Sequence, residues 1–488
     1  MKVDLKEFAF IFAAIVLVAV SLAVPNQMLA LGITGIFAVY AFLKPKNGLL
    51  LLIMYFPVRA FLIEVNPGLK GIGDAIILAS FLKVLFMQRK ELKNIFRFDF
   101  IEWAFLGFCA VGAISALLTD VRPVAIIFQL RAFLVAFLLY YIVKRLDITK
   151  EDVYKFLWVT VITGLIICLH GIIEKVSVRT LLLPEAWEQK RLTPTNKDRI
   201  YGLIGNPNVL SVFLSIVFLL TLVLRSLTDS IKVRWMLFVS LVLTLGVLEL
   251  TYSRGTFLAL GFAFIVYLVL TRRFAIVKTV AIAGVLATVL IYYPANIAAE
   301  AYGKTLMQVP YEKKPGEETP EEPQDEEDQS EAEKRLSETF NQSTLELSKK
   351  SGRLFVITKG FNVFKDHPVI GTGFATFGDS ATKTFSSPIY EDYGITRNIY
   401  SDNQYIQIIA QTGAVGVIIF AAFLLGMLYF IWKKRDVNAF ALPLLALLLG
   451  TFVWGLFYNI WENKTFTVYF FILLGYMFNY HLKRKPIS

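Results

Sequence analysis

Long apolar stretches recur along most of the chain, and they limit its possible folds more than any other feature does. A helix needs roughly 20 apolar residues to cross about 30 Å of hydrocarbon. Backbone polar groups find no water there, so a spanning segment must be a helix or part of a closed barrel. The stretches are continuous rather than alternating, which indicates helices. We place the expected spans near 7–24, 28–43, 48–63, 72–87, 101–118, 124–143, 153–172, 207–224, 235–251, 256–271, 276–293, 404–432, 439–457 and 464–481.

Composition agrees with this pattern. Hydrophobic residues make up 56% of the 488 residues and charged residues 18%, against about 45–50% and about 25% in soluble domains. The net charge of +11 does not indicate a nucleic-acid partner, because the basic residues lie in short connections between apolar stretches. The sequence therefore predicts an all-α, polytopic transmembrane helical bundle of about fourteen spans in the cell membrane.

The basic residues alternate with the expected spans, which predicts an orientation. The positive-inside rule assigns the connections rich in Lys and Arg to the cytoplasm. One missed span would reverse the alternation midway, and both termini are predicted to be cytoplasmic. The basic groups on this side are Lys44 and Lys46, Arg89 to Arg97, Lys144 and Arg145, Arg225 to Arg234, Arg272 and Arg273, Lys433 to Arg435, and Lys483 to Lys485.

One large extracytoplasmic loop is expected between two groups of spans. Residues 1–293 hold the first eleven spans, 294–403 form the loop and 404–488 hold the last three. Within the loop, 312–333 is so rich in Glu, Asp and Pro that we expect it to be disordered. Segment 351–378 follows, and helical spacing of Leu354, Ile357, Phe361 and Phe364 predicts an amphipathic helix against the bundle.

Ionisable residues within spans are costly and are candidates for function. Arg131 lies in the middle of an apolar stretch, with no acid one turn away on the same helix. It either faces a polar cavity as an anion-binding residue or forms an internal salt bridge. Arg254 lies in a tight outer connection, where it can bind an anion or meet lipid headgroups.

Further candidates lie in the expected outer segments. Arg199 precedes Asn206 and Asn208, which either cap the next span or contact a ligand at its N-terminus. His367 suits proton transfer near neutral pH, although an isolated loop histidine often has no such role. The nearby Gly371 and Gly373 could let backbone amides approach a phosphate.

Four arginines are expected on or near the outer side, namely Arg131, Arg199, Arg254 and Arg353. Guanidinium groups pair bidentately with phosphate oxygens and stay charged. Their convergence into one pocket beside a possible base would suit a polyanionic ligand such as a lipid-linked diphosphate.

At these residues the chain resembles the O-antigen ligase and Wzy-like polysaccharide polymerase superfamily. The resemblance rests on Gly205–Asn208 opening a span, Tyr252–Gly255 between paired spans, Gly352-Arg353 followed by Asp366–Phe374, and Asp402–Ile406 followed by Gly413–Gly416. It extends over roughly residues 120 to 480. The length and the acidic insert are also similar to those of Gram-positive teichuronic-acid polymerases.

The resemblance implies a glycosyltransferase that needs no cofactor and no metal. Its donor would be a glycan on undecaprenyl diphosphate, and its acceptor a sugar hydroxyl on a second repeat unit (polymerase) or on another molecule (ligase). The four arginines would bind the diphosphate, and Asn206, Asn208 and Asn403 would contact substrate. Many relatives have histidine where this chain has Asp402, so His367 and Asp402 are alternative candidates for the base.

Two other classes of function fit parts of the sequence. A flippase or another anion transporter would also use many spans and buried arginines, but no internal repeat typical of transporters is evident. A non-catalytic scaffold for envelope assembly has little reason to keep a costly charge such as Arg131 in a span.

Overall fold

The computed structural model describes residues 9–307, 348–350 and 352–479, and within these ranges it contains helices and loops but no strands. Helical structure follows from the continuous apolar stretches and from polar caps at their ends. Asn26, for example, accepts backbone hydrogen bonds at the start of α2 (Gln27–Leu43). The all-α prediction is confirmed for the described chain. The acidic insert 312–333 and Ser351 lie outside the described residues.

Nine of the described helices are long and apolar enough to cross a membrane, which fits a multi-pass membrane protein. Every expected span is helical in the structure, but the total of about fourteen crossings stays a prediction. The nine are α3 (Pro45–Val65), α6 (Phe100–Leu118), α7 (Pro123–Arg145), α8 (Lys150–Val176), α11 (Pro207–Ser226), α12 (Ile231–Leu250), α13 (Arg254–Thr271), α20 (Gln404–Lys433) and a continuous helix over Ala275–Thr305. The other expected spans correspond to the shorter α1 (Ala9–Ala23), α2, α4 (Ile72–Gln88), α21 (Ala441–Trp454) and α22 (Lys464–Met477).

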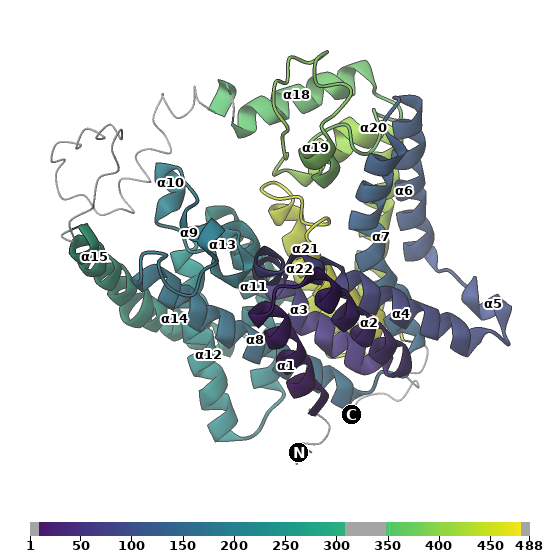
Figure 1. Cartoon of the computed structure of the whole chain (residues 1–488). Coiled ribbons are helices and arrows are strands. Elements are labelled where there is room, and N and C mark those ends of the chain that lie inside the picture. The colour runs from purple at the N-terminus through teal and green to yellow at the C-terminus, as the bar shows by residue number, and fades with distance from the viewer. Residues whose placement is uncertain (1–8, 308–347, 351, 480–488) are drawn as a thin grey trace.

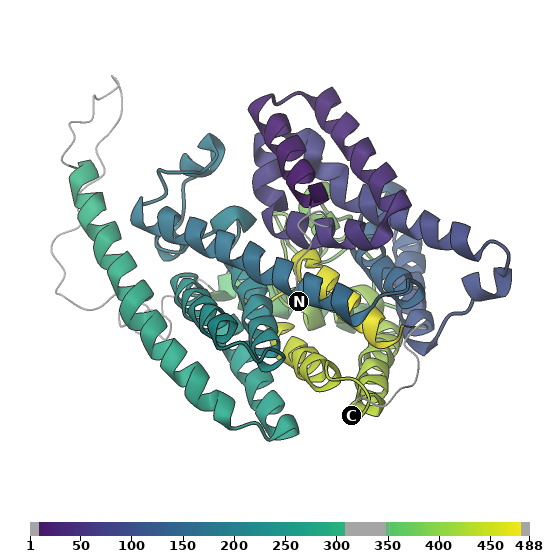
Figure 2. The same cartoon turned by 90° about the horizontal axis from the view of Figure 1, so that it is seen from below.

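Helices α7 and α22 run parallel through the middle of the bundle and define its two ends. We call the end that holds α18 (Arg353–Asp366) and α19 (Ser380–Phe385) the upper end (Figure 1). Phe128, near the start of α7, packs against Phe385 of α19. At the lower end, Asn479 donates hydrogen bonds to the carbonyls of Val143 and Leu146. Viewed from below, α1–α4 gather on one side, and the long helix that includes α15 lies on the opposite side (Figure 2).

The basic residues expected on one side of the membrane follow the lower ends of their helices. Lys46 forms an ion pair of 2.8 Å with Asp152 at the start of α8. Lys144 ends α7 and Lys433 ends α20, and both helices start at the upper end. The assignment of this lower end to the cytoplasm, and with it both termini, stays a prediction.

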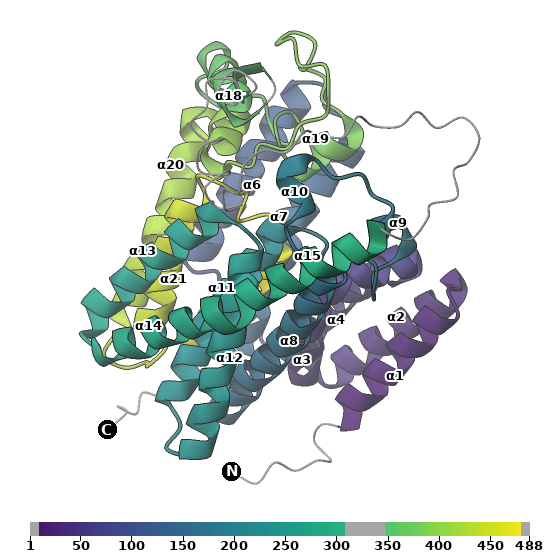
Figure 3. The ribbon, with the colours of Figure 1, turned by 90° about the vertical axis from the view of Figure 1, so that its left-hand side faces the viewer.

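The helix predicted to end near 293 continues for about four further turns. It comprises α14 (Ala275–Ala287), a π-helical turn over Thr288–Tyr292 and α15 (Tyr293–Met307), and it crosses the bundle obliquely (Figure 3). Pro294 explains the π-turn, because a proline ring clashes with the carbonyl four residues earlier in a regular helix. Widening the helix at that turn relieves the clash, so the helix continues through Pro294 and beyond the expected span of 276–293.

Helix α20 is broken at Gly413, and a loop from the upper end fills the break. Gly413 has φ +56° and ψ −162°, which is not helical. The amides of Ala414 and Val415 donate to the carbonyls of Pro368 and Val369, at 2.8 and 3.0 Å. The loop over residues 368–373 therefore supplies the hydrogen bonds that the broken helix lacks.

The same loop uses its own amides within the protein. The amide of Thr372 donates to Ala410 at 3.2 Å, and the amide of Gly373 donates to Gln411 at 2.6 Å. The amide of Gly371 donates to His367 at 3.2 Å. The glycine-containing segment thus secures the break in α20, and these amides do not face a phosphate.

The upper end has a small hydrophobic core of its own, which we call the cap. Its buried side chains come from residues 356–399 and from the start of α20. The expected amphipathic helix is present as α18, but its buried face is different. Val356, Gly360 and Val363 are buried, whereas Leu354 is 36% exposed and Phe361 45% exposed. Gly360 determines which face of α18 is buried, because only a residue without a Cβ lets the helix approach α20 so closely: a Cβ at Gly360 would lie 2.3 Å from Ile406.

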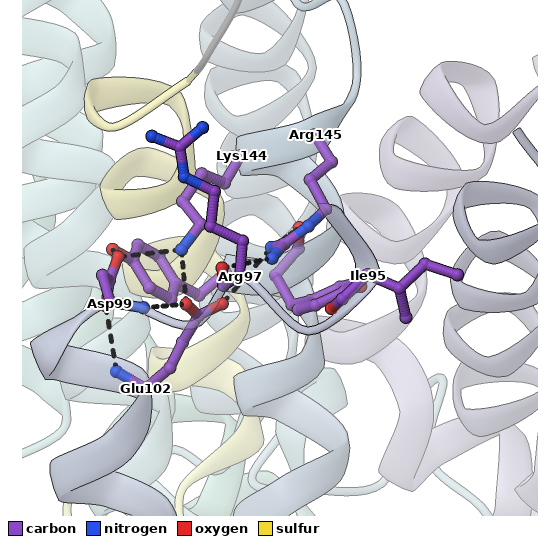
Figure 4. A network of polar contacts seen from close by, with 8 residues as sticks. Ile95, Arg97, Asp99, Glu102, Lys144 and Arg145 are labelled. Carbon is purple, nitrogen blue, oxygen red and sulfur yellow. Dashed lines mark hydrogen bonds and ion pairs between the residues drawn. The ribbon is translucent and has the colours of Figure 1, made fainter. Parts of the chain in front are cut away.

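A buried ion cluster fastens the lower end of the bundle. Glu102, in the first turn of α6, lies 2.5 Å from Lys144 Nζ and 3.3 Å from Arg145 Nη1 (Figure 4). Lys144 also pairs with Asp99 at 2.8 Å, and Asp99 caps α6 together with Glu102 in a capping box. Lys144 and Arg145 were expected in a cytoplasmic connection. They are at the lower end, but both are buried.

Candidate active site

A loop between α21 and α22, residues 455–463, connects the polar groups of the upper end. Tyr458 hydrogen-bonds Ser253 at 2.5 Å. Asn459 accepts hydrogen bonds from the hydroxyl of Ser401 at 2.7 Å and from the amide of Asn403 at 3.1 Å. The loop therefore ties the start of α13 to the segment that leads into α20.

Glu462 of this loop is buried in a network of hydrogen bonds. Its Oε1 accepts from the side-chain amides of Gln129, at 2.6 Å, and Gln407. Its Oε2 accepts from the amide and hydroxyl of Ser380, at 3.2 and 2.7 Å. Burial, followed by the nearby carboxyl of Asp379, raises the pKa of Glu462 to about 7.

Glu462 and Ser380 line a cavity of about 320 Å³ whose charged lining is mainly basic. We call it the cationic cavity. Its lining residues are Phe56, Arg59, Ala60, Lys70, Phe128, Arg131, Ala132, Ile204, Val209, Ser380, Glu462, Lys464 and Thr465. Four of these residues are cations, and Glu462 is the one carboxyl among the described residues that line it. Such a cavity suits an anion.

Arg131 projects into the cationic cavity and is also ion-paired. Its Nε lies 2.5 Å from Asp74 Oδ2, and Lys464 Nζ lies 3.2 Å from Asp74 Oδ1. Arg131 thus forms the salt bridge that was one of its two alternatives, and it also lines a polar cavity, while its binding of an anion stays a prediction. The acid comes from α4 rather than from the helix of Arg131, and it holds two cations side by side.

Arg199 lies in a second cavity, which has a volume of about 530 Å³. We call it the tyrosine cavity, and it is lined by Glu174, Lys175, Val178, Arg179, Lys197, Asp198, Arg199, Ile200, Tyr292, Tyr293, Asn296, Ile297, Ala299 and Glu300. Arg199 donates to the carbonyl of Thr251 at 2.8 Å and to the side-chain oxygen of Asn208 at 2.5 Å. Ser253 donates to the same Asn208 oxygen at 3.4 Å, so Arg199 lies close to the segment that holds Arg254.

Arg254 and Arg353 both lie next to the 455–463 loop. The Arg353 guanidinium is 5.9 Å from the centroid of the Phe457 ring. The same ring covers Gly255, where a Cβ would lie 2.6 Å from it. Arg254 and Arg353 start α13 and α18 and are exposed.

The four arginines were expected to converge into one pocket, and the structure shows that they do not. Arg131 lines the cationic cavity, and Arg199 lines the tyrosine cavity. Arg254 and Arg353 are at helix starts near Phe457. All four are at the upper end, joined by the 455–463 loop and its neighbours, but the cations that share the cationic cavity with Arg131 are Arg59, Lys70 and Lys464. None of these three was singled out from the sequence.

The two candidate bases lie away from the cationic cavity lining. His367 follows the last residue of α18, at the opposite end from Arg353, and is exposed. Asp402 adopts a left-handed φ of +46°. The pKa of Asp402 is raised above its usual value because burial outweighs the opposite effect of the nearby Arg353 and Lys383.

The asparagines have structural partners. Asn206 accepts from the amides of Asn208 and Val209, at 2.9 and 3.2 Å. Asn403 accepts from two amides at the start of α20, both at 3.1 Å. Asn206 and Asn403 are thus helix caps, and Asn208 positions Arg199.

Sequence reasoning missed Asp74, Glu462 and Lys464, all near the ends of apolar stretches. The available signal was the polar run Glu462-Asn463-Lys464 in a connection too short to form a domain. Charged residues are common at such positions, so only the contacts made in three dimensions distinguish these.

Comparison with known proteins finds a family model that matches part of the chain. Residues 239–421 match the family model Wzy_C, described as O-antigen ligase, while no match is found among curated proteins. The matched part includes Arg254, Arg353, His367 and Asp402, and it is shorter than the 120–480 expected from the motifs. The family indicates glycan transfer of the O-antigen ligase or polymerase type by a glycosyltransferase-like enzyme. The match of residues 239–421 to an O-antigen ligase model supports the resemblance of this chain to the O-antigen ligase and Wzy-like superfamily.

Proposed function

We propose that this protein transfers a glycan from an undecaprenyl-diphosphate-linked donor to a sugar hydroxyl, at the extracytoplasmic face of the cell membrane. The observation that supports this most directly is the cationic cavity at the upper end of a membrane bundle. A diphosphate is a compact polyanion, and Arg59, Lys70, Arg131 and Lys464 offer it four cations. The lipid tail of such a donor would remain in the bilayer beside the bundle.

The same cations would act on the leaving group. As the bond between the anomeric carbon and the diphosphate oxygen breaks, that oxygen gains negative charge. Fixed cations aimed at developing charge are often the largest catalytic contribution, about 2.7–4 kcal/mol for a single donor. Asp74 holds Arg131 and Lys464 in place by ion pairs, so their positions are set before the donor arrives. The cations supply positive charge to the diphosphate, so the proposal needs neither a metal nor a cofactor.

A base must take the proton of the attacking hydroxyl, and Glu462 joins His367 and Asp402 as a candidate. The Ser380 hydroxyl lines the cationic cavity and donates to Glu462 at 2.7 Å. The acceptor hydroxyl would pass its proton to Ser380 Oγ as the Ser380 proton moves to Glu462 Oε2. The acceptor oxygen then bonds to the anomeric carbon, and undecaprenyl diphosphate leaves.

We favour a polymerase that joins repeat units of a cell-envelope polysaccharide, of which a teichuronic acid is one example. A ligase that uses a different acceptor has the same chemistry. The polymer would form outside the cell, with both termini of the chain in the cytoplasm.

The test is an assay in nanodiscs with purified protein and lipid-linked repeat units. Arg131→Ala should abolish most product formation, and Arg131→Lys should not restore it if the guanidinium fork binds the diphosphate. Arg89→Ala is the matched control, because Arg89 ends α4 at the opposite end of the bundle. Full activity of both Arg131 variants would contradict the proposal. Movement of lipid-linked units across the membrane without a new glycosidic bond would indicate a flippase instead.

A further inference from the structure

The tyrosine cavity is separate from the cationic cavity and has a different chemical character. Its volume of about 530 Å³ is within the range of about 300–1,000 Å³ that is usual for small-molecule sites. Two tyrosines and Asn296 of the η4–α15 helix form one wall, and polar residues between Glu174 and Ile200 form the other.

The cations of this cavity already have protein partners. Arg179 pairs with the buried Glu174 and donates to the carbonyl of Trp187 at 3.3 Å. Lys175 donates to the carbonyl of Asp198 at 3.0 Å. Three acidic residues, Glu174, Asp198 and Glu300, line this cavity, whereas Glu462 is the one carboxyl among the described residues that line the cationic cavity. The tyrosine cavity is therefore less suited to a diphosphate than the cationic cavity is.

The remaining lining groups suit a saccharide. Tyr293 is 57% exposed, and its ring meets that of Tyr292 edge to face, with centroids 5.5 Å apart. Aromatic faces pack against the C–H faces of sugar rings, while tyrosine hydroxyls and the Asn296 amide both donate and accept hydrogen bonds. Tyr252, whose hydroxyl lies 3.3 Å from Asn296 Oδ1, extends this polar edge.

The backbone around the cavity is strained. Val178 and Arg179 have φ of +50° and +65°, and Tyr252 has φ of +51°. Positive φ is a genuine outlier for a β-branched residue such as Val178. Strained residues cluster at ligand clamps and active sites, where the surrounding structure holds them.

One segment separates the two cavities. Arg199 and Ile200 line the tyrosine cavity, and Ile204 and Val209 line the cationic cavity. A ligand in each cavity would thus contact opposite sides of the same short wall. We propose that the tyrosine cavity binds the part of the acceptor glycan remote from its attacking hydroxyl, an uncharged or weakly charged hydroxyl-rich saccharide, while the attacking end extends past this segment to Ser380 and the donor diphosphate in the cationic cavity. This inference rests on the proposed function.

The experiment uses the full chain in nanodiscs, lipid-linked repeat units as donor and the free repeat-unit oligosaccharide as acceptor. Tyr293→Ala and Asn296→Leu should each raise the KM for the oligosaccharide about tenfold, the effect of losing one good contact. The kcat and the KM for the donor should stay close to wild type. Tyr302→Ala is the matched control, because Tyr302 lies on the same helix and is 37% exposed, outside the cavity lining.

A direct binding measurement separates failure of this inference from failure of the proposed function. Without donor, the oligosaccharide should bind wild type and the Tyr302→Ala variant equally, and the two cavity variants about tenfold more weakly. Equal binding or an equal acceptor KM in all variants would overturn the inference and leave glycan transfer intact. Oligosaccharide binding that depends on Tyr293, with no transfer from any lipid-linked donor, would overturn the proposed function alone.

Discussion

Replacing Glu102 by Gln tests whether the buried ion cluster stabilises the lower end of the bundle. The side chains of Lys144 and Glu102 are 1% and 2% exposed, and that of Arg145 is 0% exposed. Removing one charge from a buried cluster costs about 3–5 kcal/mol, because the remaining charges lose their partner without regaining water. Gln keeps the shape of Glu, so the effect isolates the charge.

This free energy translates into a shift of melting temperature. Unfolding entropy of about 2.1 cal/mol/K per residue gives about 1 kcal/mol/K for 488 residues, so the expected shift is at least about 3–5 °C. The real shift should be larger, because a membrane protein keeps helices when it unfolds and so gains less entropy than this figure assumes.

The chain provides its own reporter for this experiment. Its 2 cysteines, Cys109 and Cys168, are both free and buried, so a thiol-reactive fluorophore reacts only as the bundle opens on heating. Glu91→Gln is the matched control, because Glu91 is exposed in the connection just before α6. Equal melting temperatures of Glu102→Gln and Glu91→Gln would refute the reasoning.

A double-mutant cycle sharpens the result. Glu102→Gln combined with Lys144→Gln removes one charge of each sign and leaves Arg145 its hydrogen bonds to the carbonyls of Tyr141 and Arg97. The double variant should be less destabilised than the two single effects together, by about 0.5–3 kcal/mol. Simple additivity would show that the charges do not interact.

Three other changes probe the upper end. Arg131→Lys should lower the rate of glycan transfer at least about tenfold, because one ammonium cannot replace a bidentate fork; an unchanged rate in the nanodisc assay would exclude that contact. The pKa of Glu462 is raised from 4.5 to about 7, so its contribution to stability is full below about pH 4.5 and is lost as pH rises through about 7. Thermal unfolding of Glu462→Gln should vary less with pH than that of wild type, and equal pH dependence would argue against a raised pKa of this carboxyl. Gly373→Ala should lower the free energy of unfolding by more than about 3 kcal/mol, because Gly373 has φ +92° and a Cβ there would lie 1.9 Å from the α6 backbone. Gly284→Ala is the control and should retain the wild-type melting temperature, because a Cβ at Gly284 would have nothing within 4 Å.

The helices were predictable from the sequence because lipid allows few alternatives. The span expected at 207–224 is α11, Pro207–Ser226, and its start is set by the Asn206 cap. Errors arose where tertiary contacts override a local rule. The helix expected to span 276–293 continues through Pro294, and Gly360 allows close packing that turns a different face of α18 inward.

The site was only partly predictable. Arg131 was recognisable because a charge within an apolar stretch needs a partner or a cavity, and it has both. Asp74, Glu462 and Lys464 were not, because charges at helix ends are ordinary and their pairing depends on how distant helices pack. The separation of Arg131 from Arg199 likewise follows from the 199–209 segment, whose role as a wall between two cavities has no local signature.

The 455–463 loop leaves the ribosome after α7, α13 and the cap, yet it forms hydrogen bonds to residues of all three. A translation product that stops after α21 would insert most of its helices, and it would lack Glu462 and Lys464. Its Asp74 would hold one cation instead of two, and its Gln129 would lose a carboxylate partner. Chains that terminate before this loop should therefore enter the membrane without the hydrogen-bond network that joins α7, α13 and the cap.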